Sequence, residues 1–266
     1  MGDGDEPWAV IWDMDGVLVD SGEAHYEAWA RLFREEGIPY TREQFLQAFG
    51  QRNDRILRTL LGPDLPEDRL RELEARKEAY YRALIPSRVR LLPGAWELLH
   101  ALREAGARQA VGSSGPRANV EATLAALDLG PFFGALVAAE DVREGKPAPE
   151  VFLVAAERLG VPPARCVVLE DAVAGVQAAL AAGMRCVALT TTRPAHELAA
   201  AHRVVASLRE VLAEDLRRLA LGWGKQVAEG GTLQPPPGGG KPRAAPCEVR
   251  PTVGVQGMPI SSTGGA

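Results

Sequence analysis

The feature of this 266-residue sequence that most restricts its fold is a regular alternation of short apolar runs with helix-like stretches. The apolar runs have the length of buried strands, and they are WAVIWD, ARQAVGSS, ALVAAED, CVVLED, RCVALTT and RVVAS. The helix-like stretches are Gly94–Ala105, Arg117–Leu127, Glu150–Leu159, Ala172–Ala182, Ala195–Ala201 and Leu208–Ala220. Continuously apolar strands that alternate with helices are typical of parallel sheets covered on both faces. We therefore predict an α/β fold with a Rossmann-like parallel sheet core.

The stretch that follows the first apolar run has a different texture. Residues 21–86 lack strand-like runs, are rich in Glu, Arg, Leu and Ala, and are broken at Gly37-Ile38-Pro39 and at Gly62-Pro63. This pattern predicts about four helices, inserted as a cap domain into a core domain made of residues 7–20 and 87–221. Because ligands of open α/β sheets bind beyond the carboxyl ends of the strands, such a cap is a candidate lid over the site.

The last 45 residues, 222–266, contain 11 of the 28 glycines and 7 of the 20 prolines. Aperiodic sequence with more than roughly 25–30% Pro plus Gly does not bury enough apolar surface to offset the entropy of the chain. We predict a disordered C-terminal tail, and a partner-binding role for it is left open.

Composition restricts the partners. The chain has 30 Lys plus Arg and 35 Asp plus Glu, a formal net charge of -5, which argues against a nucleic acid held by bulk charge. No apolar run approaches the roughly 18 residues of a membrane span, and the N-terminus has no apolar signal-peptide core. Three cysteines do not predict a disulfide framework. We expect a cytoplasmic monomer that binds neither nucleic acid nor membrane.

Two aspartates directly follow the first apolar run, in the sequence Asp13-Met14-Asp15-Gly16. Residues i and i+2 of a strand point to the same side, so the two carboxylates leave the strand together, and Gly16 frees the chain to turn. Carboxylates about 4 Å apart repel by about 4 kcal/mol at an effective dielectric constant of 20, whereas a divalent cation about 2 Å from a carboxylate oxygen attracts it by about 16 kcal/mol. The pair therefore predicts a Mg²⁺ site, with an acidic strand-end turn as the alternative.

Three further segments with polar residues follow other predicted strands. The small residues of Gly112-Ser113-Ser114-Gly115-Pro116 let N–H groups and a hydroxyl approach an anion at a helix N-terminus. Glu170-Asp171 can supply more carboxylate oxygen to a hard cation, and Lys146 lies in the proline-pinned loop EGKPAPEVF. Taken singly, these segments also fit an ordinary turn, an acidic helix cap and a solvated lysine. Together they predict one site, because a parallel sheet places these loops side by side.

The segments DMDGVLVDSGEAH, GSSGPRAN, GKPAPEVF and LEDAVAGVQAALAAGM resemble, in the same order, the four motifs of the haloacid dehalogenase-like superfamily. The nearest branch is the one that contains β-phosphoglucomutase and small sugar-phosphate phosphatases, which carry a helical cap after the first motif. The resemblance extends over residues 8–221 and leaves out the tail.

The resemblance implies roles for the motif residues. Asp13 would be the nucleophile that forms an aspartyl-phosphate, and Asp15 the general acid and then the base that activates water. Lys146 would neutralise charge around Asp13 and the phosphoryl group. The phosphate-binding residues would be Gly16, Ser113 and Ser114.

The resemblance also implies a ligand set for Mg²⁺ and contacts from the cap. Asp13, the backbone carbonyl of Asp15 and Asp171 would hold the ion, with Glu170 as an additional or outer ligand. In the cap, three residues match positions that assist proton transfer or contact the substrate, namely His25, Arg52 and Lys77. The alternatives are a partly buried helix histidine for the first and solvated helix faces for the other two.

The sequence thus predicts a Mg²⁺-dependent phosphatase of a small phosphorylated metabolite, specifically a sugar phosphate. The alternative is an intramolecular phosphomutase of the β-phosphoglucomutase kind, in which a substrate hydroxyl instead of water accepts the phosphoryl group. A third hypothesis is a catalytically idle sugar-phosphate sensor that recruits a partner through the tail.

Overall fold

Six parallel strands form the central sheet of the computed structural model, which describes residues 6–48 and 50–222. Their order across the sheet is β5-β4-β1-β6-β7-β8. The strands are β1 (Ala9–Trp12), β4 (Arg108–Gly112), β5 (Ala135–Val137), β6 (Cys166–Glu170), β7 (Arg185–Leu189) and β8 (Arg203–Val205). Each lies within one of the six apolar runs, so the predicted strands and the α/β class are confirmed. The predicted tail, residues 222–266, lies outside the described residues except for Gly222.

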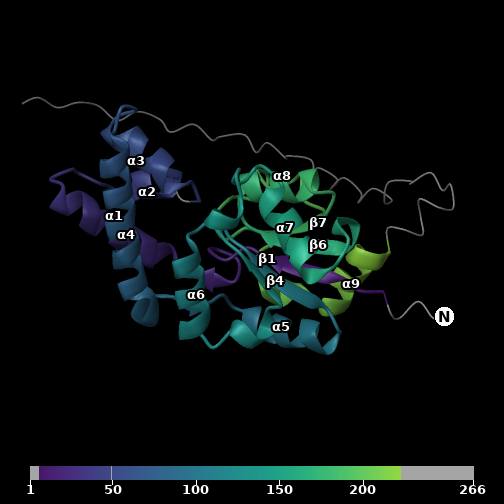
Figure 1. The fold of residues 1–266 in the computed structure, drawn as a ribbon. Helices are drawn as coiled ribbons and strands as arrows, with labels where there is room; N and C mark the ends of the chain where they lie inside the picture. Colours follow the sequence, from purple (N-terminus) through teal and green to yellow (C-terminus); the bar gives the residue numbers. More distant parts are fainter. Residues whose placement is uncertain (1–5, 49, 223–266) are drawn as a thin grey trace, which may run out of the picture. The chain divides into compact units, whose positions relative to one another are not determined.

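Helices cover both faces of the sheet (Figure 1). Alternate side chains of β1 pack on opposite faces of the sheet. Val10 and Trp12 belong to one hydrophobic cluster, and Ala9 and Ile11 belong to the other. The first cluster contains residues of α5 (Ala95–Glu104), α6 (Arg117–Ala126) and α9 (Ala213–Leu221). The second contains residues of α7 (Glu150–Leu159) and α8 (Val173–Ala181). All four residues of β1 are fully buried, as its continuously apolar sequence requires.

One predicted helix is wrong. Residues Ala195–Ala201 form successive turns, in which Leu198 N–H bonds to Ala195 O and Ala201 N–H to Leu198 O. Seven residues offer few helical hydrogen bonds against the cost of nucleation, and within this segment only Leu198 is buried. The predicted helix over Leu208–Ala220 divides into a 3₁₀ turn at Leu208–Glu210 and α9. Further 3₁₀ turns occur at Gly130–Phe132, Ala139–Asp141 and Pro163–Arg165.

The predicted helical insertion is present in the described residues as four helices that follow β1 (Figure 1). They are α1 (Gly22–Glu35), α2 (Arg42–Ala48), α3 (Asn53–Leu61) and α4 (Glu67–Arg88). Their buried side chains form a third hydrophobic cluster, which includes Trp29, Phe33, Leu57 and Leu73. The division of the chain into core and cap domains at the predicted boundaries stays a prediction.

A short antiparallel pair joins the helical insertion to the sheet. Strand β2 (Val19–Asp20) carries the chain into α1, and strand β3 (Arg90–Leu91) receives it from α4. Each has two residues, which is too short to leave a period in the sequence. Helix α4 then runs beside α6 of the sheet domain. Of the helices within the described ranges, none has both the length and the apolar composition needed to cross a bilayer.

Candidate active site

A cavity of about 660 Å³ lies beyond the carboxyl ends of β1, β4 and β6, with α1, α3 and α4 contributing the opposite wall. This volume falls within the usual range for small-molecule sites. The wall contains ten of the eleven predicted site residues: Asp13, Asp15, His25, Arg52, Lys77, Ser113, Ser114, Lys146, Glu170 and Asp171. The structure therefore brings the separate strand-end motifs together, as the parallel topology predicts.

Gly16 is the eleventh predicted residue, and it lies against the site without lining the cavity. Its φ of +85° is in the left-handed region, and a Cβ on it would lie 2.1 Å from Oδ2 of Asp171. Its carbonyl oxygen accepts a hydrogen bond of 2.5 Å from the Thr191 hydroxyl. Glycine is therefore required for both the turn and the close approach of the backbone to Asp171.

Asp13 follows directly after β1 and faces a buried ammonium group. Lys146 Nζ donates to Asp13 Oδ1 and, at 2.6 Å, to Glu170 Oε1. Burial raises the pKa of Asp13 to about 7, against the opposing effect of Lys146. Burial alone would lower the pKa of Lys146, but Asp13 and Glu170 outweigh it and hold that pKa above its ordinary value. The lysine is thus a permanent positive charge beside Asp13.

Asp15 has entirely different partners. Its Oδ1 accepts a hydrogen bond of 2.5 Å from the Ser21 hydroxyl and lies 3.4 Å from His25 Nε2. Burial would raise the pKa of Asp15, but the interactions with His25 and Ser21 outweigh it and lower the pKa. Asp15 is consequently ionised and can accept a proton.

His25 and Lys77 extend the contacts of Asp15 as far as helix α4. Lys77 Nζ lies 3.0 Å from His25 Nδ1, and the His25 ring stacks on Tyr81 with centroids 3.9 Å apart. An ammonium group only donates, so Nδ1 accepts and the ring hydrogen is assigned to Nε2, which faces Asp15. Burial and the nearby Lys77 lower the pKa of His25, which favours the neutral ring. Neither residue is a solvated helix side chain.

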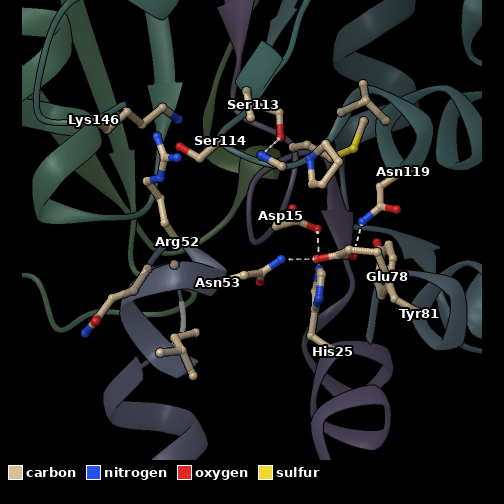
Figure 2. A pocket seen from close by; sticks show the side chains of 18 of the residues that line it. Asp15, His25, Arg52, Asn53, Glu78, Tyr81, Ser113, Ser114, Asn119 and Lys146 are labelled. Carbon is tan, nitrogen blue, oxygen red and sulfur yellow. Dashed lines mark hydrogen bonds and ion pairs between the residues drawn. The ribbon is translucent and has the colours of Figure 1, made fainter. Parts of the chain in front are cut away.

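Glu78 lies at the end of this series of contacts that begins at Asp15. Its Oε1 accepts a hydrogen bond of 2.8 Å from Lys77 Nζ. Oε1 also accepts one from Asn53 Nδ2 (2.6 Å), and Oε2 accepts one from Asn119 Nδ2 (Figure 2). Asn119 lies in the first turn of α6, and its Oδ1 accepts a bond of 3.0 Å from Arg82 Nη1 on α4. The helical insertion and the sheet domain are therefore joined by a polar network at the cavity.

Ser113 and Ser114 lie between β4 and α6, where the predicted phosphate-binding turn was expected. Ser113 is 2% exposed, and its Oγ accepts a hydrogen bond of 3.0 Å from the Gly115 N–H. This bond leaves the Ser113 hydroxyl hydrogen available to a ligand oxygen.

Asp171 and Asp13 form a pair of buried carboxylates. Burial, together with Glu170 and Asp13, raises the pKa of Asp171 well above its usual range. Its Oδ2 accepts a bond of 2.6 Å from Thr192 Oγ1, and Oδ1 has no hydrogen-bond donor among the described residues. Mg²⁺ binds through one or two carboxylates and keeps several waters, so two carboxylates with a backbone carbonyl are a suitable oxygen ligand set. Across the described ranges, no group of three or more Asp, Glu, His or Cys residues is arranged to hold a metal.

The Glu170 carboxylate, predicted as an additional or outer Mg²⁺ ligand, is hydrogen-bonded to protein donors. Its Oε2 accepts hydrogen bonds of 2.7 Å from the N–H groups of Asp171 and Ala172, at the start of α8, and its Oε1 accepts from Lys146. Both oxygens are thus held by protein donors, so in this structure Glu170 positions Lys146 and satisfies the start of a helix.

Arg52 reaches from the start of α3 toward the sheet domain. Its Nε lies 3.4 Å from Asp54 Oδ1, and its Cδ would be 3.6 Å from a Cβ built on Gly145, next to Lys146. Figure 2 shows its guanidinium pointing toward Ser114 and Lys146. Arg52 is exposed, and it faces the same end of the cavity as the predicted phosphate site.

Sequence reasoning missed eight residues that the structure places in the network, namely Ser21, Asn53, Glu78, Tyr81, Arg82, Asn119, Thr191 and Thr192. The threonines follow β7, so the strand-end argument applied to Asp13 and Ser113 could have found them. Asn53, Glu78 and Asn119 carry no such signal, because only the packing of the insertion against α6 brings them together.

Comparison with known proteins decides the family. The family model described as a haloacid dehalogenase-like hydrolase matches residues 9–183. The chain belongs to this family. It is 37% identical over 213 residues to validoxylamine A 7'-phosphate phosphatase of Streptomyces hygroscopicus subsp. limoneus. This alignment covers 76% of this chain and 94% of that protein. It is 36% identical over 177 residues to fructose-1-phosphate phosphatase of Escherichia coli (strain K12), covering 66% and 92%.

Solved structures agree with this assignment. The β-phosphoglucomutase of Clostridium difficile superposes with a TM-score of 0.73 at 26% identity, covering 82% of this chain and 99% of that one. The predicted resemblance is confirmed, and the chain is a haloacid dehalogenase-like phosphohydrolase.

Proposed function

We propose that the protein is a Mg²⁺-dependent phosphatase of sugar phosphates that works through an aspartyl-phosphate on Asp13. The observation that carries the proposal is the contrast between two neighbouring carboxylates: Asp13 contacts the Lys146 ammonium, and Asp15 contacts the neutral His25 ring and the Ser21 hydroxyl. Two carboxylates in different environments can take different roles in one reaction. The similarity to phosphatases named for validoxylamine A 7'-phosphate and for fructose 1-phosphate supports the substrate class.

In the first step, a carboxylate oxygen of Asp13 attacks phosphorus, and the bond from phosphorus to the alkoxide oxygen of the substrate breaks. Lys146 and the Ser113 hydroxyl stabilise the charge on the phosphoryl oxygens. Asp15 is ionised before the substrate binds, and the bound phosphate dianion raises its pKa. It therefore carries a proton in the complex, which it gives to the leaving oxygen.

In the second step, the leaving alcohol has departed and Asp15 is again a carboxylate. It takes a proton from a water molecule, whose oxygen attacks the phosphorus of the aspartyl-phosphate. The bond between phosphorus and Asp13 breaks, so inorganic phosphate and the free Asp13 carboxylate are formed. The contacts of His25 and Ser21 with Asp15 hold its carboxylate in one orientation for both transfers.

The residues suited to Mg²⁺ are Asp13, Asp171 and the backbone carbonyl of Asp15. When bound, the ion supplies positive charge that neutralises the phosphoryl oxygens and the two carboxylates. Calorimetric titration with Mg²⁺ tests this assignment without an activity measurement. We expect binding to wild type and a loss of at least tenfold in affinity for Asp171→Asn, whereas unchanged affinity would contradict the assignment.

The enzymatic proposal is tested with a panel of phosphorylated metabolites, measured as phosphate release with and without EDTA. Wild type should release phosphate from sugar monophosphates, and EDTA or Asp13→Asn should reduce the rate by at least 10³-fold, because nucleophile and cation are both needed. Asp128→Asn is the matched control, since this residue is exposed and has a φ of 53° that Asn also tolerates. Equal release by wild type and Asp13→Asn would refute the proposal.

An intramolecular phosphomutase is the second candidate, because the β-phosphoglucomutase structure is similar over 82% of the chain. It differs only in the acceptor of the phosphoryl group, which is a substrate hydroxyl instead of water. Phosphorus NMR of β-glucose 1-phosphate with a trace of the 1,6-bisphosphate separates the two. Inorganic phosphate without glucose 6-phosphate favours the phosphatase. Cytoplasmic location and a monomeric state remain our predictions.

A further inference from the structure

Glu78 is a buried carboxylate whose partners come from three different helices. It is 6% exposed, lines the cavity, and accepts a hydrogen bond from Lys77 on α4. It accepts two more from Asn53 on α3 and Asn119 on α6 (Figure 2). An ionised carboxylate has about four acceptor positions, so three are filled by the protein and one remains. A group that fills it must donate a hydrogen.

The two asparagines beside Glu78 add complementary groups. Each side-chain amide has two N–H donors and one oxygen acceptor. Asn53 uses one N–H on Glu78, and its other N–H and its oxygen have no partner among the described residues. Asn119 uses one N–H on Glu78 and its oxygen on Arg82. This wall of the cavity therefore offers both acceptors and donors within a few ångströms, and a hydroxyl group satisfies both.

Charge on this wall is already balanced. Lys77 is 2% exposed, and its ammonium group lies 2.8 Å from Glu78 Oε1, so the buried cation and the buried anion neutralise each other. A second phosphate would bring only acceptors and negative charge against Glu78, which is unfavourable in a buried site. A hydroxylated, uncharged group matches the wall better.

Glu78, Asn53 and Asn119 line the part of the cavity where the leaving group of the substrate is expected. Asp15 connects to Glu78 through His25 and Lys77, at 3.4 Å, 3.0 Å and 2.8 Å in turn. In the proposed reaction Asp15 protonates the leaving oxygen, so the carbon skeleton of the substrate extends from Asp15 into the cavity. Glu78, Asn53 and Asn119 line that part of the cavity, on the cap side and at the start of α6.

We propose that Glu78, held in place by Asn53 and Asn119, is a specificity-determining residue that accepts a hydrogen bond from a hydroxyl of the carbon skeleton. This assigns the substrate class as the monophosphate ester of a polyhydroxylated alcohol, and it rests on the proposed phosphatase function. Glu78 does not touch the reacting atoms. Its loss should therefore lower the ratio of kcat/KM for a hydroxylated substrate to kcat/KM for a substrate without hydroxyl groups.

The test compares kcat/KM for two esters with similar alkoxide leaving groups. One is fructose 1-phosphate, or the sugar monophosphate with the highest kcat/KM in the panel, and the other is cyclohexyl phosphate, which has no hydroxyl groups. Glu78→Gln should reduce kcat/KM for the sugar phosphate by about 10–100-fold, the usual worth of one charge-assisted hydrogen bond. For cyclohexyl phosphate the change should stay below about threefold.

Glu74→Gln is the matched control variant. Glu74 lies one turn earlier on α4, is partly buried, lines the same cavity and loses the same charge on substitution. It should leave the ratio of the two kcat/KM values within about threefold of wild type. If Glu74→Gln lowers that ratio as strongly as Glu78→Gln, the specific role of Glu78 is refuted.

The outcomes separate this inference from the function on which it rests. If wild type hydrolyses neither ester nor any compound of the panel, the proposed function fails and the inference fails with it. If wild type is active and Glu78→Gln slows both esters equally, Glu78 acts only through Lys77 and Asp15, and the inference alone is refuted. Should Glu78→Gln not fold, Asn53→Ala at a partly exposed position replaces it, with a loss of about 3–10-fold expected for the sugar phosphate only.

Discussion

The imidazole of His25 lies with Nε2 at 3.4 Å from Oδ1 of Asp15. Its other nitrogen faces the Lys77 ammonium, so the ring hydrogen points at the carboxylate. Stacking on Tyr81 fixes the plane of the ring. A helix of the insertion thus orients a carboxylate of the sheet domain, and this contact depends on the insertion staying packed over the strand ends.

We predict that His25→Gln reduces kcat/KM for sugar phosphates by about 10–100-fold, part of the 10²–10⁴-fold that general acid–base catalysis contributes. The loss of kcat/KM for p-nitrophenyl phosphate should be below about threefold, because kcat/KM covers only the steps up to departure of the leaving group and this leaving group needs no proton. Steady-state kinetics on both substrates measures the difference. His196→Gln, at an exposed position in the turns after β7, is the control. An equal loss of kcat/KM on both substrates would mean that His25 does not assist proton transfer from Asp15 to the leaving oxygen.

A second prediction concerns Thr192, whose hydroxyl donates to Oδ2 of Asp171 at 2.6 Å. Partners that orient a metal ligand commonly contribute 10–100-fold to metal affinity. Thr192→Val should therefore weaken Mg²⁺ binding by about that factor in calorimetric titrations. Thr192→Ser keeps the hydroxyl and should restore affinity to within about threefold of wild type. If Val and Ser bind Mg²⁺ alike, the hydroxyl has no such role.

A third prediction uses Gly175 in the first turn of α8. A Cβ on this residue would lie 1.7 Å from Oε1 of Glu170, whose carboxylate folds back onto the helix and holds Lys146. Ala is ordinarily favoured over Gly in a helix by about 1 kcal/mol, but here overpacking should win. We expect Gly175→Ala to lower the free energy of unfolding in urea by about 1–3 kcal/mol.

The clash can be isolated with a double-mutant cycle. In a Glu170→Ala background the atoms that meet the new Cβ are absent, so adding Gly175→Ala should cost nothing or stabilise slightly. The same destabilisation in both backgrounds would show that Glu170 is not the residue that requires glycine at this position.

The strands and the strand-end site could be predicted because both leave local marks in the sequence. A buried parallel strand is apolar throughout, and a polar residue directly after it, such as Asp13, is placed at the carboxyl edge by topology alone. The prediction of a helix at Ala195–Ala201 was wrong because composition cannot show that only Leu198 of this segment is buried.

The network around Glu78 could not be predicted for a different reason. Its partners Asn53 and Asn119 are 25 and 41 residues away along the chain, on separate helices. Their meeting depends on how the insertion packs against α6, and no period or spacing encodes that. Lys77 and His25 could be named only through family resemblance, since in sequence each is an ordinary helix residue.

The last prediction concerns stability at acid pH. Hydrogen bonds from Arg158 and the Ala138 N–H, with the positive charge of Arg117, lower the pKa of Asp141 from 3.8 to about 2. Because the pKa is depressed in the folded state, this contribution is complete above about pH 5 and is lost as the pH falls from 3.8 through 2. We expect Asp141→Asn to cost about 1–2 kcal/mol at pH 7, since both arginines are partly exposed. Urea unfolding at pH 7, 5, 4 and 3, with Asp128→Asn as control, should show the difference from wild type shrinking below pH 4. A difference that is constant down to pH 3 would exclude Asp141 as the titrating group.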